Sequence, residues 1–121
     1  MEQELEAAKS QLSDSADHVL KAGPLEVRLD QRTVLADGRG IVLTVREFHL
    51  LAVLASRPEQ VVSREEIYDL VWSGRMPEHD RSVDVYVSKL RHKLESALPH
   101  WNFIQTHIGF GYCFSPKPLA S

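Results

Sequence analysis

The sequence predicts a single α+β domain in which short antiparallel strands precede three helices and a β-hairpin closes the chain. Two changes of period support this prediction. Apolar residues alternate with a period of two from Leu25 to about Thr44, and then recur with the 3.6-residue period of helices. After Pro99 the alternation returns around closely spaced glycines. A chain of 121 residues has the length of one hydrophobic core.

The composition argues against several classes of protein. Hydrophobic residues make up 43% and charged residues 26% of the chain, as in ordinary globular proteins. No apolar run approaches the ~18 residues of a membrane span. The acidic opening MEQELEAAKS lacks the layout of an export signal, and a lone cysteine, Cys113, cannot form an internal disulfide. We therefore expect a cytoplasmic protein with no membrane partner.

The net charge of −3 is unevenly distributed. Residues 1–20 carry five acidic residues and one lysine, and the remaining 101 residues carry thirteen basic and twelve acidic ones. The first segment therefore sums to −4 and the rest to +1. Any attraction for phosphate must come from local clusters of basic residues.

The first segment has a weak helical pattern. Its apolar positions, at helical spacing, are Leu5, Ala8, Leu12, Ala16 and Val19. The stripe is thin, so the segment is either a linker or a marginal helix that docks or pairs with a second copy. Gly23-Pro24 breaks the pattern. We expect a helical or linker segment over 1–22, the folded domain over 23–116 and a tail over 117–121.

Three strands are expected next, over 25–30 (LEVRLD), 33–38 (TVLADG) and 41–44 (IVLT). Turn signals at Asp30-Gln31 and Asp37-Gly38 separate them. The β-branched residues and the short spacing favour an antiparallel sheet.

Two helices then begin with the same capping box, a hydroxyl residue followed three positions later by a glutamate. Thr44 and Glu47 open the first, and Ser63 and Glu66 open the second. The first should end near Arg57, before Pro58, and the second near Trp72, with Gly74 as its C-cap. The residues expected to face inward are Phe48, Leu51, Leu54, Ala55, Ile67, Leu70 and Val71.

A third helix is expected over 81–98, with Asp80 as its N-cap and Pro99 after its end. Its buried stripe should consist of Val83, Val87, Leu90 and Leu94. The hairpin follows, with the strand FIQTHI, the turn Gly109-Phe110-Gly111 and the return strand YCFS. This order of elements is that of a winged helix-turn-helix, with an N-terminal antiparallel sheet, three helices and a C-terminal β-hairpin wing.

Enzymatic chemistry has little support in the sequence. The histidines form no HxxxH or HExxH pair, and one cysteine cannot supply a CxxC zinc site. Gly109-Phe110-Gly111 lacks the helix and the lysine of a phosphate-binding loop. We therefore expect no enzyme activity, metal or cofactor.

The outer face of the third helix has the character of a DNA-reading surface. It is basic and partly apolar, and its members are Arg81, Ser82, Val85, Tyr86, Ser88, Lys89, His92 and Lys93. The major groove admits a helix and presents donors, acceptors and thymine methyl groups. Val85 suits a methyl contact, and the cations suit phosphates or guanine edges. A solvated basic face is the alternative. Arg91 has two interpretations, a phosphate contact or an ion pair with Asp84 seven residues earlier.

Three stretches together resemble the DNA-binding domain of the OmpR/PhoB family of bacterial two-component response regulators. They are LTVREFHLLAVLASRPEQVVSREEIYDLVW, DRSVDVYVSKLRHKL and THIGFGYCF, and the resemblance covers roughly residues 25–115. It implies a winged-helix regulator of transcription that binds double-stranded DNA and takes part in a phosphorelay.

The resemblance also implies roles for individual positions. Residues 81–98 match the recognition helix, and wing residues 107–111 match a segment near the minor groove. The further positions implied to contact DNA are Trp72, Arg91, Thr106, His107 and Gly109. The loop between the second and third helices, from Ser73 to Asp80, matches a segment that can meet RNA polymerase in such regulators, with candidates Arg75, Met76, Glu78 and His79.

Two departures concern the wing. Ile108 and Cys113 stand where relatives often carry arginine, so we expect weaker minor-groove contact, with His107 as a partial substitute. The resemblance further implies an upstream receiver domain, missing from this chain, and a second copy in tandem on DNA. The alternative function is that of a protein-interaction winged helix, which binds RNA polymerase or a partner regulator without reading DNA.

Overall fold

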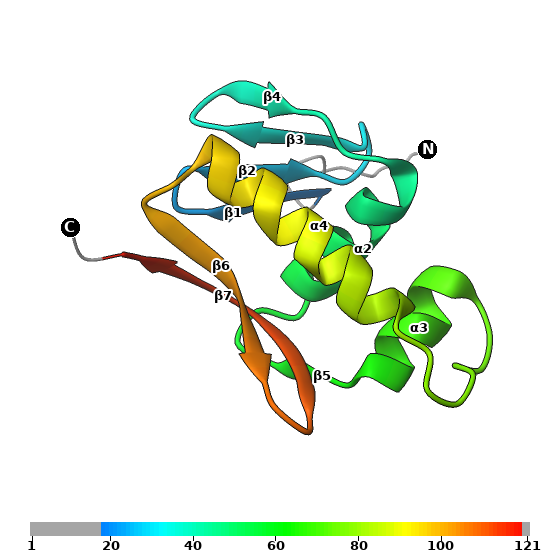
Figure 1. Ribbon diagram of the computed structural model, residues 1–121. Helices are drawn as coiled ribbons and strands as arrows, with labels where there is room; N and C mark the ends of the chain where they lie inside the picture. Colours follow the sequence, from blue (N-terminus) through cyan, green and yellow to red (C-terminus); the bar gives the residue numbers. More distant parts are fainter. Residues whose placement is uncertain (1–17, 120–121) are drawn as a thin grey trace, which may run out of the picture. The chain divides into compact units, whose positions relative to one another are not determined.

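Figure 1 shows a computed structural model of the chain, in which residues 18–119 are described. These residues belong to two compact units, one ending at Gly40 and the other beginning at Ile41. The first unit consists mainly of a β-sheet, and the second contains the three described helices and a further sheet.

The N-terminal sheet has four strands in the order β1-β2-β3-β4. They are β1 (Val19–Ala22), β2 (Leu25–Arg28), β3 (Thr33–Ala36) and β4 (Arg39–Ile41). The pairs β1–β2 and β2–β3 are antiparallel, and Leu25 lies opposite Ala36. The predicted turn at Asp37-Gly38 is confirmed, because both residues have positive φ, 51° and 81°, as a two-residue hairpin turn requires.

Three expectations for this region are wrong. Val19 belongs to a strand instead of the end of a helix, and Gly23-Pro24 forms the turn between β1 and β2 instead of preceding the first strand. The strand predicted over 41–44 lies earlier, at Arg39–Ile41. The rest of the predicted N-terminal helix, up to residue 17, lies outside the described residues, and the division into 1–22, 23–116 and 117–121 stays a prediction.

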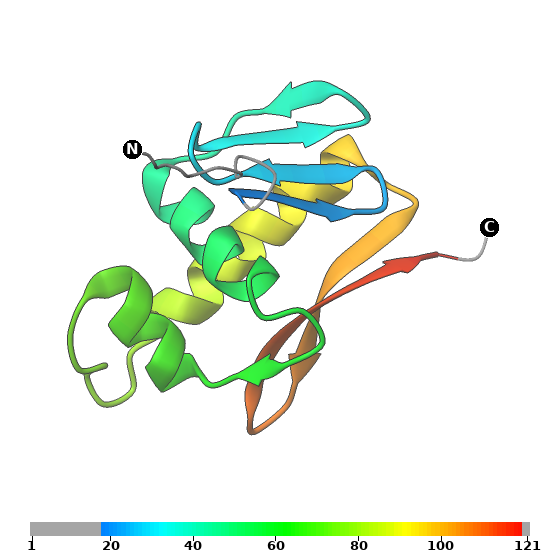
Figure 2. The same cartoon turned by 180° about the vertical axis from the view of Figure 1, so that it is seen from behind.

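The second unit holds α2 (Val45–Ala55), α3 (Arg64–Trp72) and α4 (Ser82–Ala97). A three-stranded sheet in the order β5-β7-β6 accompanies them, with β5 (Val61–Val62), β6 (Trp101–His107) and β7 (Gly111–Pro118). Figure 2 shows β5 beside the long β6–β7 hairpin. The short β5 was not predicted, because two residues are too few to form a sequence pattern.

The predicted caps explain where the helices begin. Thr44 and Glu47 form the complete capping box of α2, with each side chain accepting from the backbone N–H of the other residue. At α3 only half of the box forms, in which the Ser63 hydroxyl accepts from the Glu66 N–H. The C-cap of α3 is Ser73, with φ 63°, so the prediction of Gly74 is wrong by one residue.

The buried stripe of α4 is confirmed. Val83, Val87, Leu90 and Leu94 are each at most 2% exposed. The predicted N-cap of α4 is wrong by one residue, because the cap is Arg81, which makes no side-chain cap hydrogen bond. The Asp80 carboxylate, one position earlier, accepts from the Ser82 N–H at 2.7 Å. The inward residues of α2 are also buried, whereas Leu70 of α3 is 44% exposed, contrary to prediction.

The order of helices followed by a hairpin makes the second unit a winged helix, as the sequence predicts. In Figure 1 the hairpin extends beyond the helices and ends in the turn between β6 and β7. Within residues 18–119 no helix combines the length and apolar character needed to cross a bilayer.

Candidate nucleic-acid interface

The face of α4 opposite the buried stripe is open to solvent. Arg81, Ser88, Lys89 and His92 are exposed, and Val85 retains 46% of its surface. Cations and a hydroxyl therefore surround an exposed aliphatic side chain on one regular helix. This mixture of cationic, polar and apolar side chains can complement the hydrogen-bond acceptors and thymine methyl groups that base pairs present in a major groove.

An aromatic cluster supports one side of this face. Trp72 of α3 stacks on Tyr68, with ring centres 5.3 Å apart, and meets the edge of Tyr86 of α4 at 5.4 Å. The Lys89 ammonium lies 4.9 Å from the centre of the Tyr86 ring, and the Arg46 guanidinium lies 4.9 Å from that of Trp72. These contacts hold Arg46 over the Trp72 indole and Lys89 over the Tyr86 ring.

Sequence reasoning missed Arg46. It lies in the first turn of α2, 26 positions before Trp72 and 40 before Tyr86, so no local pattern connects it with α4. A hollow of about 580 Å³ lies beside it and is lined by Val45, His49 and Tyr86 among others.

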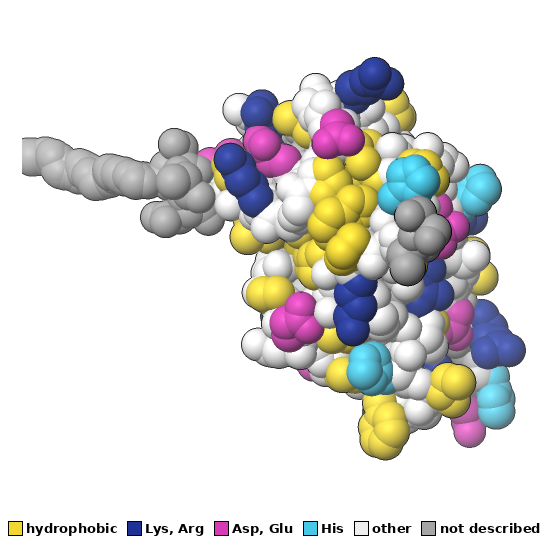
Figure 3. Space-filling model, turned by 90° about the vertical axis from the view of Figure 1, so that its left-hand side faces the viewer, with side chains coloured by type: hydrophobic (Ala, Val, Ile, Leu, Met, Phe, Trp, Pro, Cys, Tyr) yellow, Lys and Arg dark blue, Asp and Glu magenta, His cyan; other side chains and the backbone are white. Residues whose placement is uncertain are grey.

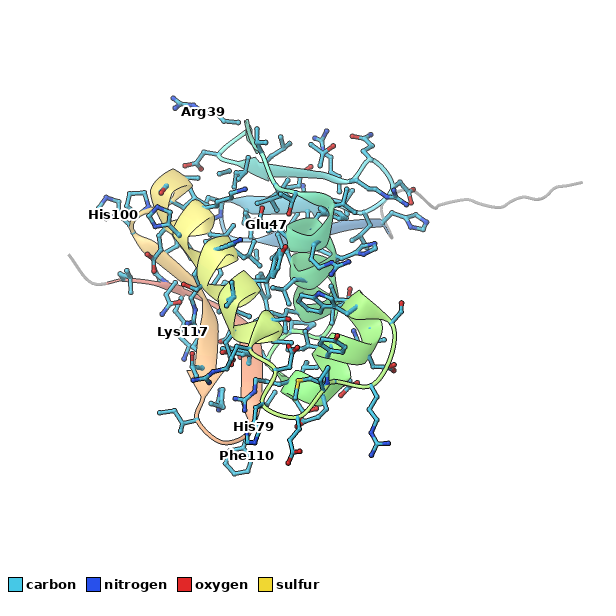
Figure 4. The ribbon with its side chains drawn as sticks, turned by 45° about the vertical axis from the view of Figure 1, so that its right-hand side comes forward. Arg39, Glu47, His79, His100, Phe110 and Lys117 are labelled. Atoms are coloured by element: carbon cyan, nitrogen blue, oxygen red, sulfur yellow. The ribbon has the colours of Figure 1, made fainter. Side chains whose placement is uncertain are left out.

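Lys93 is engaged within the protein. Its ammonium lies 2.6 Å from the Glu47 carboxylate, which is 3% exposed. Figure 4 shows the labelled Glu47 on the helix beside α4. Burial alone raises the pKa of Glu47, but the Lys93 ammonium and the Thr44 N–H outweigh that effect and hold this pKa below its ordinary value. Lys93 therefore neutralises a buried carboxylate that also caps α2.

Arg91 also has partners within the protein, but they differ from the ion pair with Asp84 that the sequence suggested. Its guanidinium donates to the Ile104 carbonyl at 3.1 Å and to the Thr106 hydroxyl, and lies 5.6 Å from the centre of the Tyr112 ring. The interpretation that Asp84 holds it is wrong. Arg91 instead ties α4 to both strands of the hairpin.

Asp84 forms a second tie between α4 and the hairpin. Its carboxylate accepts a hydrogen bond from the Tyr112 hydroxyl at 2.5 Å and lies 3.7 Å from Arg81 and 3.9 Å from Arg64. Burial and this hydrogen bond to a carboxylate raise the pKa of Tyr112 to about 12. The tyrosine therefore stays a neutral donor at physiological pH.

The hairpin presents its predicted residues at the surface. Thr106, His107 and Gly109 are all exposed. The two apolar residues of the turn are more exposed still, Ile108 at 90% and Phe110 at 75%. Cys113, by contrast, is buried, and burial raises the pKa of its thiol.

The loop between α3 and α4 surrounds a hollow of about 810 Å³. Arg75, Met76, Glu78 and His79 all line it, so the structure brings the four loop candidates together. Arg64 and Glu65 of α3 complete part of the wall. Across residues 18–119 there is no cluster of three or more histidine, cysteine or carboxylate side chains that could hold a metal ion.

The fold and this surface define a winged-helix domain with an exposed recognition-type helix. Residues 38–114 match the family described as "Transcriptional regulatory protein, C terminal". The chain belongs to this family, whose members regulate transcription and are not enzymes.

Individual relatives agree with this assignment. The chain is 35% identical over 103 residues to the DNA-binding response regulator MtrA of Mycolicibacterium smegmatis, covering 85% of this chain and 45% of MtrA. It is similar to the DNA-binding domain of CpxR from E. coli, with 32% identity and a TM-score of 0.74 over 80% of this chain and 95% of that one.

A third relative was solved on DNA. The Klebsiella pneumoniae RstA DNA-binding domain, in complex with the RstA box, is 29% identical with a TM-score of 0.73, over 80% of this chain and 96% of that one. The chain spans less than half the length of the full-length relatives it matches.

Proposed function

We propose that this domain binds double-stranded DNA in a sequence-specific manner and thereby regulates transcription, with α4 in the major groove. The observation that carries the proposal is the exposed face of α4, where Arg81, Val85 and Lys89 project away from a fully buried stripe. Membership of a family of transcriptional regulators supports it, and so does a similar domain solved with its DNA box.

The exposed residues divide into readers of bases and contacts to phosphate. Val85 packs on a thymine methyl group, and Lys89 and Ser88 reach base edges. Arg81 contacts phosphate, as do the residues at the margin of the face, which are Ser82, His92, Trp72 and Arg46. Because Arg91 and Lys93 have intramolecular partners, we assign them to holding the wing and α2 in position.

Salt dependence and substitution test this function together. DNA sites would be selected from a random pool, and affinity measured by fluorescence anisotropy across a range of salt concentrations. Lys89→Ala should weaken binding. If Lys89 contacts one phosphate, the slope of log affinity against log salt should fall in magnitude by about 0.9. If Lys89 reads a base edge, the loss should be confined mainly to DNA that carries the preferred base at that position. Val85→Ala should change the preferred base without changing that slope.

Lys117→Ala provides the matched control, because it removes the same charge from an exposed position near the far end of β7 (Figure 4). Its binding should equal that of the unaltered protein. Negligible binding by the unaltered protein at low salt would refute the proposal, and so would equal losses for Lys89→Ala and Lys117→Ala, which would indicate bulk charge alone.

Further partners follow from the resemblance to response regulators. We propose an upstream receiver domain in the full-length protein and a second copy in tandem on DNA, both consistent with relatives that are about twice as long. The hollow lined by residues 75–79 favours a protein partner, RNA polymerase, at the α3–α4 loop. Polymerase capture that survives Lys89→Ala but is lost on deletion of 75–79 would support that contact, whereas capture by the deletion variant would exclude it.

A further inference from the structure

A groove between α2 and α3 leaves apolar surface partly uncovered. Leu70 of α3 is expected to face inward, yet it is 44% exposed. It lies beside a hollow of about 290 Å³, and this α2–α3 groove is lined by His49, Ala52, Val53, Ser56, Arg57 and Leu70. Three of these residues, Ala52, Val53 and Leu70, are apolar, and none of the three is buried. Other parts of the described chain therefore do not cover the groove.

The α2 side of the groove is apolar and cationic. The polar residues of α2 are Arg46, Glu47 and His49, and the single carboxylate among them, that of Glu47, is buried. Arg57 follows the end of the helix, and its guanidinium donates to the Val53 carbonyl at 3.1 Å. No exposed carboxylate of α2 therefore opposes Arg57 along this side.

The α3 side of the groove is acidic. Glu66 and Asp69 are exposed, and Leu70 lies one helical turn after Glu66. The only basic residue of α3 is Arg64, and its guanidinium lies 3.9 Å from the carboxylate of Asp84 on α4. The charges around the groove are therefore sorted by helix, with cations on the α2 side and carboxylates on the α3 side.

This sorting of charge separates the groove from ordinary exposed apolar surface. Figure 3 shows one side of the molecule, on which uncovered hydrophobic side chains lie among basic, acidic and histidine side chains. Scattered residues of that kind need no partner. A partner that covers the α2–α3 groove must instead present carboxylates to α2 and cations to α3, together with an apolar side chain between them.

We propose that a second copy of this chain covers the groove in a symmetric dimer. A two-fold axis along the groove lays α2 of each copy on α3 of the other. Arg57 of each copy then approaches the carboxylates of Glu66 and Asp69 in the other copy. Each Leu70 packs against Val53 of the other copy. Every favourable contact forms twice, so the same surface is complementary to itself.

This dimer goes beyond the proposed DNA-binding function. A tandem pair on DNA joins two different surfaces of neighbouring copies, whereas this contact joins the same surface of each. The groove contains no residue of α4. In Figure 1 α4 lies in front of α2, and in Figure 2, from behind, α2 lies in front of α4. The dimer therefore forms without DNA and leaves the exposed face of α4 free in both copies.

Analytical ultracentrifugation without DNA is the first test. Because few apolar side chains line the groove, the interface belongs to the small and weak class, and we expect a dissociation constant of about 100 µM. Leu70→Glu places a charge among apolar side chains and should weaken dimerisation more than tenfold. Leu119→Glu is the matched control, because Leu119 is similarly exposed, at 50%, and follows β7. Its dimerisation should equal that of the unaltered protein.

A charge swap tests the pairing of α2 with α3. Arg57→Glu and Asp69→Lys each bring like charges together twice in the dimer, and each should weaken dimerisation about fivefold. The protein that carries both substitutions should regain most of the lost affinity, because opposite charges then face each other again. Thermal unfolding followed by circular dichroism shows whether each variant is folded at the temperature of the experiment.

Amide chemical shifts of the ¹⁵N-labelled protein locate the contact. Between about 50 µM and about 1 mM, the signals of Ala52, Val53 and Leu70 should move with concentration, whereas that of Lys89 should not. A protein that stays monomeric at about 1 mM overturns the proposal. A dimer that survives Leu70→Glu, equal losses for Leu70→Glu and Leu119→Glu, or shifts confined to another surface overturn it as well.

Discussion

The pair formed by Glu47 and Lys93 makes a quantitative prediction about stability. Glu47→Ala removes the acceptor for the Thr44 N–H, which completes the cap of α2, and leaves the Lys93 ammonium without its partner. Loss of a helix cap costs about 1 kcal/mol. Loss of a charge-assisted hydrogen bond costs about 1.5–3 kcal/mol when both groups are buried. Because the Lys93 side chain is 36% exposed, water compensates for part of this loss, and we take about 1 kcal/mol.

The expected destabilisation by Glu47→Ala is therefore about 2 kcal/mol. Urea denaturation followed by circular dichroism should show a midpoint lower by about 1 M with an unchanged slope. Glu47→Gln is the matched control, because the amide oxygen still accepts from Thr44 while the charge is gone, and it should cost about 1 kcal/mol.

The same pair predicts a dependence on pH. The pKa of Glu47 lies below its ordinary value in the folded protein, so protons bind more tightly to the unfolded chain. Its contribution is complete above the unfolded pKa of about 4.5 and is lost as the pH falls through the lower folded pKa. Between pH 6 and pH 3 the stability gap between the unaltered protein and Glu47→Gln should therefore shrink.

Lys93→Met separates this structural role from DNA contact. It should cost about 1 kcal/mol of stability and leave DNA affinity within about twofold at temperatures where the protein is folded. If the Lys93→Met protein had unaltered stability and bound DNA poorly, the structural role of Lys93 would be refuted. Lys93 would then be assigned a direct contact with DNA.

Three further substitutions test the packing of the winged helix. Leu90→Ala should cost about 3 kcal/mol in urea denaturation, because Leu90 is 0% exposed and its removal leaves a cavity. Gly111→Ala should cost about 3 kcal/mol, because the added Cβ would lie 2.0 Å from the Val62 carbonyl oxygen at a φ of 152°; a stable variant would contradict this close approach. Tyr112→Phe should lower the free energy of unfolding by about 1.5 kcal/mol, because it removes the hydrogen bond to Asp84. An ultraviolet titration of the three tyrosines should then lack the group whose pKa is about 12.

Several features of the fold were predictable because they arise from interactions over three or four residues. The capping box at Thr44 and Glu47 forms in full, and the buried stripe of α4 appears at the expected spacing. The errors have equally physical causes. Val19–Ala22 is a strand because it pairs with β2, and that tertiary contact overrides a thin helical pattern. The left-handed residue after α3 is Ser73, one position before the glycine expected there.

By itself, the sequence determined that α4 exists, which stripe of it is buried and that a basic face with Val85 remains, since helical periodicity depends only on neighbouring residues. Only the tertiary structure decided which cations on that helix are engaged. Lys93 meets a carboxylate 46 positions away, and Arg91 meets acceptors 13 and 15 positions away on a strand. Such partners are brought together by packing of separate elements, and no spacing along the chain records them.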